Sequence, residues 1–215
     1  MSIVIYFFIS PIASIIQSYY TSNGMEAQCN DINDISTDTK VIVNINMVNA
    51  CDIGHMAVVE KMIVCGSDWW NWGLNKACVG GHMAMVDKMI ACGANSWNFG
   101  LEGACIGGHI AIVEKMIACG ADYWNGGLWR ACYGGHIAVV QKMIDCGATY
   151  WNWGLASACI GGHMSVIEKM IECGADNWND ALEGACKGGH MALVEKMIAY
   201  GATKICCKKH KLLFK

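Results

Sequence analysis

The stretch Trp70–Ser96 reads WNWGLNKACVGGHMAMVDKMIACGANS, and versions of it recur along the chain. Six histidines stand at positions 55, 82, 109, 136, 163 and 190, always 27 residues apart, with similar letters around each one. Because internal periodicity at such a spacing decides the architecture of a chain, this repeat carries the fold. We assign six units to residues 43–204, of which the first diverges most, with Val43–Met47 in place of Trp70–Leu74.

Each unit predicts two short helices. Apolar residues from Leu74 to Cys78 follow the i, i+3, i+4 pattern and precede Gly80-Gly81, where a left-handed helix exit needs glycine, which predicts a first helix over residues 72–79. A second apolar stripe ends at a further glycine and predicts a second helix over residues 82–92. Two helices this short cannot bury their apolar faces alone, so the units must stack into an elongated solenoid.

A Trp-Asn pair opens each full unit. We expect the side chain of Asn71, and of its copies, to cap the first helix of its own unit. Trp70 and its copies form a column one repeat apart. Since an indole ring buries a large apolar area, and since this letter does not vary, we expect the column to pack between units rather than to bind a partner.

The letters from Leu74 to Ala94 resemble the ankyrin repeat from its first helix onward: Leu-x-x-Ala-Cys-x-Gly-Gly-His-x-x-Met-Val-x-x-Met-Ile-x-x-Gly-Ala. The unit departs from that family in its 27 residues against 33, in lacking the Thr-Pro-Leu-His opening, and in Lys88, which stands where the family usually has leucine. The six missing residues fall where ankyrin repeats carry a β-hairpin finger. The resemblance therefore implies an all-α, ankyrin-like helical solenoid of about six two-helix repeats lacking β-hairpin fingers. Tryptophan-rich arrays with this period are most similar to the ankyrin-repeat proteins of amoeba-infecting giant viruses.

Cysteine and histidine recur together, but their spacing does not favour a chemical site. Cys78 and His82 have zinc-like spacing, yet one unit offers only these two close ligands and the next pair lies a whole stacked repeat away. A nucleophilic pair would need a distinguishing third group, which the copies lack. We therefore predict no metal, no cofactor and no catalytic residues. Cys78 should fill a small buried slot, and His82 should hydrogen-bond around the turn between the helices.

The fourteen cysteines do not predict a disulfide framework. Cys78 and Cys92 lie at opposite ends of the unit, about 15 Å apart at a rise of about 1.5 Å per residue, whereas a disulfide needs Cα atoms within about 7 Å. Thiols that stay reduced favour an intracellular protein. We expect it in the host cytoplasm.

The composition favours a folded chain with an acidic body. The sequence is 54% hydrophobic and 15% charged, against a usual charged share of about 25%. The net charge is −3, but residues 1–203 contain 10 basic and 18 acidic side chains, and the remaining five lysines lie in the tail. An acidic body disfavours nucleic-acid binding.

Variation between units is concentrated in the first helix and in the loop before it. In ankyrin-like stacks the first helices line the concave face, so the resemblance implies that the variable positions coincide with a surface for partner recognition. The candidate partner-binding residues are Trp72, Phe99, Tyr123, Trp129, Arg130, Tyr133 and Trp153. Because tryptophan, tyrosine and arginine dominate interface energetics, we predict a monomeric, non-catalytic interaction scaffold or adaptor with a protein partner. We expect these residues to form one continuous strip.

The two ends leave alternatives open. Residues 1–42 are first apolar and then acidic, and no charge occurs before Glu26. The stretch Ile3–Ile9 is compatible with a membrane anchor, with a signal sequence, or with a mis-assigned start upstream of Met25. A membrane-tethered adaptor using residues 1–20 is therefore one alternative function. Residues 205–215 form a basic cap or tail, and an accessory factor that uses this tail is the other.

Overall fold

The structure is a computed structural model that describes residues 37–203. Over this range it contains twelve helices and no strand. The helices form six antiparallel pairs: α3 (Thr37–Ile53) with α4 (Met56–Val64), α5 (Trp70–Gly80) with α6 (Met83–Ala91), α7 (Trp97–Gly107) with α8 (Ile110–Ala118), α9 (Trp124–Gly134) with α10 (Ile137–Asp145), α11 (Trp151–Gly161) with α12 (Met164–Glu172), and α13 (Trp178–Gly188) with α14 (Met191–Ala199). The predicted all-α solenoid of six two-helix repeats is confirmed, as is the lack of β-hairpins between the described repeats.

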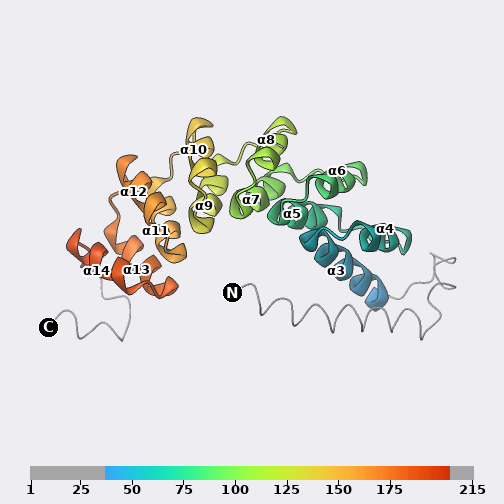
Figure 1. The fold of residues 1–215 in the computed structure, drawn as a ribbon, viewed down its shortest axis with the longest axis horizontal. Helices are drawn as coiled ribbons and strands as arrows, with labels where there is room; N and C mark the ends of the chain where they lie inside the picture. Colours follow the sequence, from blue (N-terminus) through green and yellow to red (C-terminus); the bar gives the residue numbers. More distant parts are fainter. Residues whose placement is uncertain (1–36, 204–215) are drawn as a thin grey trace.

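The six pairs stack into an arch (Figure 1). The first helices of the pairs, α5 to α13, follow its inner side, and the second helices, α6 to α14, follow its outer side (Figure 1). Each first helix packs closely on the first helices of the neighbouring repeats, whereas neighbouring second helices touch much less. Because the inner layer is the more tightly packed one, the array curves around its first helices.

The ends of the helices differ slightly from those that the sequence predicts. The first helix begins at Trp70 rather than at residue 72, and the second covers Met83–Ala91 rather than 82–92. Gly81 follows the first helix with φ of 79°, the left-handed exit expected of the glycine pair. The predicted cap is wrong, because Asn71 lies inside the helix, and Trp69, which precedes the helix, makes no side-chain cap bond.

The core runs continuously through the array along both predicted stripes. Leu74, Ala77 and Cys78 of the first helix are completely buried, as are the apolar residues of the second helix that face them. Small residues permit this close packing: a Cβ at Gly100 would come 2.6 Å from the Sδ of Met116. The tryptophan column is partly buried against this core, at Trp70, Trp97, Trp124, Trp151 and Trp178. The column therefore packs against the core, and its role between units stays a prediction.

Several predictions concern segments outside the described residues. The anchor, signal and alternative-start interpretations of residues 1–24 fall in this category, as does the basic tail of residues 205–215. Among residues 37–203, no helix has the length and apolar character needed to cross a membrane.

Candidate functional site: the first-helix face

The repeated asparagine joins each repeat to the next. The Oδ1 atom of Asn71 accepts hydrogen bonds from the backbone N–H groups of Asn95 (2.8 Å) and Ser96 (2.9 Å), in the loop that leads into α7. The equivalent bonds are made by Asn98 to Asp122 and Tyr123, by Asn125 to Thr149 and Tyr150, and by Asn152 to Asp176 and Asn177. The side chain predicted to cap its own helix therefore holds the loop before the next first helix.

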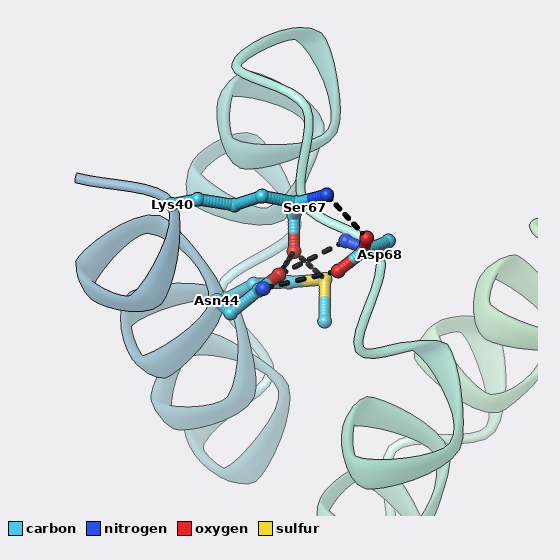
Figure 2. Close-up of polar contacts among 5 residues, drawn as sticks. Lys40, Asn44, Ser67 and Asp68 are labelled. Atoms are coloured by element: carbon cyan, nitrogen blue, oxygen red, sulfur yellow. Dashed lines mark hydrogen bonds and ion pairs between the residues drawn. The ribbon is translucent and has the colours of Figure 1, made fainter. Parts of the chain in front are cut away.

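The divergent first repeat keeps this junction in a more buried form. The Oδ1 atom of Asn44 accepts hydrogen bonds from the Asp68 backbone N–H (2.9 Å) and from the Ser67 hydroxyl (2.7 Å), as Figure 2 shows. The Asp68 carboxylate accepts from the Asn44 amide at 3.0 Å and pairs with Lys40 at 2.6 Å. The hydrogen bond from Lys40 lowers the pKa of Asp68. This pairing holds the loop before α5 against α3.

The repeated histidine also acts between repeats. The Nε2 atom of His82 lies 3.1 Å from the carbonyl oxygen of Asp52, at the end of the preceding first helix. The same contact, at 3.0 Å, joins His109 to Val79, His136 to Ile106, His163 to Tyr133 and His190 to Ile160. Because a carbonyl oxygen can only accept, Nε2 carries the proton and donates. The predicted bond within the turn is therefore wrong: the histidine stabilises the previous repeat's helix end.

The seven predicted partner-binding residues lie on four neighbouring first helices, α5, α7, α9 and α11, and in the loop that precedes α9. Trp72, Tyr123, Trp129, Tyr133 and Trp153 are exposed, and Phe99 and Arg130 are partly exposed. Trp129 and Tyr133 are four residues apart on one side of α9 and are exposed, whereas Leu128 of the same helix is buried. We call these seven residues, with their two exposed neighbours Trp69 and Tyr150, the first-helix face.

Aromatic and charged contacts join parts of this face. The rings of Trp72 and Phe99 meet edge to face with their centroids 5.0 Å apart, which links α5 to α7. The Arg130 guanidinium lies 4.3 Å from the centroid of the Trp129 ring and forms an ion pair of 3.0 Å with Glu102 of α7. Cation–π contacts of this kind hold both side chains in place. The structure thus brings together Trp72 with Phe99, and Trp129 with Arg130.

Two other predicted residues have local partners. Trp153 contacts Tyr150 with ring centroids 5.4 Å apart, rather than another of the seven. Tyr123 lies over Gly126, where a Cβ would clash with its ring. Gly126 occupies the position of Trp72 and Trp153 in other repeats, so the glycine makes room for the tyrosine.

Sequence reasoning missed two exposed aromatic residues, Trp69 and Tyr150. They are 38% and 51% exposed and occupy the loop position of Tyr123 in their own repeats. The 27-residue spacing from Tyr123 to Tyr150 was the signal that could have found the second of them. Trp69 also helps to line an open hollow of about 440 Å³, together with Asp68, Trp70, Asn71, Trp72, Ser96 and Phe99.

The cysteines offer no reactive group in the core. Burial raises the pKa of Cys78, Cys132 and Cys159 to about 12, so these thiols stay protonated at neutral pH. A protonated thiol is a poor nucleophile and a poor metal ligand. Over residues 37–203, no group of three or more histidine, cysteine or acidic side chains could hold a metal ion.

Comparisons with known proteins identify the fold. No protein-family model matches the chain, and no curated protein matches it significantly. Among solved structures, the ankyrin repeat domain of human ASB11 is similar, with a TM-score of 0.51 and 21% sequence identity over 73% of this chain and 84% of that chain. The chain has an ankyrin-type fold. At this level of identity the similarity concerns the fold alone.

Proposed function

We propose that the chain is a non-catalytic interaction scaffold that binds a protein partner on its first-helix face. The observation that carries this proposal is the set of exposed aromatic residues on adjoining first helices, at positions that differ from repeat to repeat. Framework residues such as Asn98 and His109 recur unchanged and are engaged between repeats. Only the variable positions can therefore select a partner, and exposed tryptophan and tyrosine are the residues that most often anchor one.

A protein fits this surface better than nucleic acid does. Phosphate binding requires a cluster of free lysine or arginine side chains. The first-helix face contains one arginine, Arg130, and its charge is balanced by Glu102. Two other cations on first helices, Lys76 and Lys187, are also paired, with Asp52 at 3.7 Å and Glu183 at 2.8 Å. Tryptophan, tyrosine, phenylalanine and arginine side chains are instead enriched at protein interfaces.

The proposal of a non-catalytic role rests on how the histidines and cysteines are used. The Nε2 atoms of His82 and its copies donate to backbone carbonyls of the preceding repeat, which gives these histidines a structural role. Cys78, Cys132 and Cys159 of the first helices are buried and protonated. These side chains serve the packing of the stack, which supports a non-catalytic role.

We also propose a cellular location and an origin for the protein. Buried thiols such as those of Cys105 and Cys132 suit a reducing compartment, which supports an intracellular location, in the cytoplasm of a host cell. The tryptophan-rich unit of 27 residues supports an origin among the ankyrin-repeat proteins of giant viruses. A partner would then be a protein of the host cell.

The test compares two double variants in cells that produce the chain. Trp129→Ala with Arg130→Ala removes the centre of the first-helix face. The matched control, Glu114→Ala with Lys142→Ala, removes an ion pair of 3.3 Å on the second-helix face. Proximity labelling should recover the partners of the parent chain with the control and lose at least one with the first variant. Circular dichroism should show both variants folded. If the first variant keeps every partner, the proposal is wrong.

A further inference from the structure

The first helix of the first repeat has a surface of exposed aliphatic side chains. On α3, Val41, Ile42, Ile45 and Ile53 are 44%, 58%, 45% and 50% exposed. Ile42, Ile45 and Ile53 follow helical spacing, three and then eight residues apart, so they share one side of the helix. We call these four residues the end surface. It differs from the first-helix face, whose exposed residues are aromatic.

Glycine positions in the later repeats show what this end of α3 would face. The residue equivalent to Ile53 is glycine in every later repeat: Gly80, Gly107, Gly134, Gly161 and Gly188. At each of these glycines a Cβ would press against a backbone carbonyl of the preceding first helix; for Gly134 the distance to the oxygen of Ile106 is 2.6 Å. An isoleucine side chain cannot fit such a contact. No further repeat can therefore stack on the end surface in the same way, whether from this chain or from a second copy.

The second helix of the first repeat is incompletely covered as well. Val58 of α4 is partly exposed, whereas its equivalents Met85, Ile112, Val139, Val166 and Leu193 are at least 96% buried. The later repeats differ from the first in having a repeat before them. Uncovered apolar side chains at the end of a solenoid favour a covering segment of another kind.

We propose that residues 1–24 of the same chain cover the end surface. This segment carries no charge and includes seven consecutive apolar residues, Ile3–Ile9. Its composition is therefore complementary to the aliphatic residues of α3. A buried contact of this kind removes apolar area from water on both sides.

The connection between the segment and α3 allows this contact. Twelve residues, 25–36, connect the segment to α3, and a tether of that length can span up to about 40 Å. The helix α3 has 17 residues and is about 25 Å long. The segment can therefore reach every part of the end surface, and the tether gives it a high effective concentration there.

A membrane suits residues 1–24 less well than the end surface does. A spanning helix needs about 20 predominantly apolar residues, whereas the run that begins at Ile3 ends after seven residues at Ser10-Pro11.

The first experiment locates the segment in the full chain. A photo-reactive benzoylphenylalanine replaces Phe7, and the cross-linked product is mapped by mass spectrometry. The proposal requires cross-links within one chain, to α3 or α4. Cross-links only between chains, identified with isotope-labelled copies, would make a second copy the occupant. Cross-links to lipid in the presence of phosphatidylcholine vesicles, or no cross-link to the first repeat, would also overturn the proposal. A probe at Trp153 is the control and should not reach residues 1–24.

The second experiment uses amide hydrogen exchange in the full chain to test whether residues 1–24 protect α3. Phe7→Ser with Phe8→Ser, and separately Ile42→Ser with Ile53→Ser, should each speed amide exchange in α3 at least fivefold. The combination should add little to either, because both pairs act through the same contact. Trp153→Ser should leave exchange in α3 unchanged. Equal exchange in the parent and in the Phe7, Phe8 variant, or full additivity of the two pairs, would refute the contact.

Discussion

On the first-helix side of the arch, the polar side chains that recur in every repeat bond to backbone groups of the neighbouring repeat, whereas on the second-helix side the recurring ones form ion pairs with other side chains. Ion pairs between first helices, such as Arg130 with Glu102, do not recur. His109 and Asn98 show the first kind. Lys142 with Glu114 of the preceding repeat, at 3.3 Å, shows the second, and Lys115 with Asp87 is equivalent. Every repeat offers the same backbone groups, so the first kind of contact recurs without depending on the partner residue.

Gln141 shows that the array forms without one of the ion pairs between second helices. It occupies the acidic position of α10, so the lysine of the next repeat, Lys169, has no carboxylate there and pairs with Glu172 of its own helix at 3.8 Å. The helices of the array continue unchanged on both sides of this gap. Exposed ion pairs of this type contribute about 0–1 kcal/mol each, and the stack does not depend on them.

The largest expected loss of stability comes from a change in the core, between the two layers of helices. Leu128→Ala removes a completely buried side chain from α9 and leaves a cavity between repeats. We expect the free energy of unfolding to fall by about 2–5 kcal/mol. Urea denaturation followed by circular dichroism measures it. A loss below that of the surface variants described next would mean that the core assignment of α9 is wrong.

An intermediate effect is expected on the first-helix side. Asn125→Ala leaves the backbone N–H groups of Thr149 and Tyr150 without their acceptor. We expect a loss of about 1 kcal/mol in the free energy of unfolding. Asn125→Asp keeps an acceptor oxygen and should lose less in the same denaturation experiment. Equal losses in the two variants would show that the acceptor is not what matters.

A smaller effect is expected from the ion pairs of the second-helix side. Lys115→Ala removes the partner of Asp87, and both side chains are partly open to solvent. We expect the stability to change by no more than about 0.5 kcal/mol at moderate salt. A loss as large as that of Asn125→Ala would remove the difference between the two sides.

The smallest expected effect is an increase in stability. Gln141→Glu places a carboxylate opposite Lys169, where Glu114 stands opposite Lys142. We expect a stabilisation of about 0.2–0.5 kcal/mol that disappears in 1 M salt, where surface charges are screened. Thermal unfolding at low and high salt provides the measurement. A gain that persists in 1 M salt would have a cause other than the ion pair.

The repeated letters predict the helices well and the polar contacts poorly. Leu74 and Gly81 report on burial and on backbone conformation, which a local pattern reveals. Asn71 and His82 have partners 24 and 30 residues away, in the adjoining repeats. A local pattern contains no record of that partner, so the assignment of a cap within the unit was the natural error.

The sequence by itself determined the period, the two helices of each unit and the need to stack, because short amphipathic helices must bury their apolar stripes against one another. It also determined which positions vary. Only the tertiary structure decided which side chains at those positions contact one another. The close packing of the first helices brings Trp72 against Phe99 and places Glu102 beside Arg130, contacts between side chains in different repeats. Such contacts depend on the rotation and distance between successive repeats, which follow from the packing of the whole stack and not from the letters of one unit.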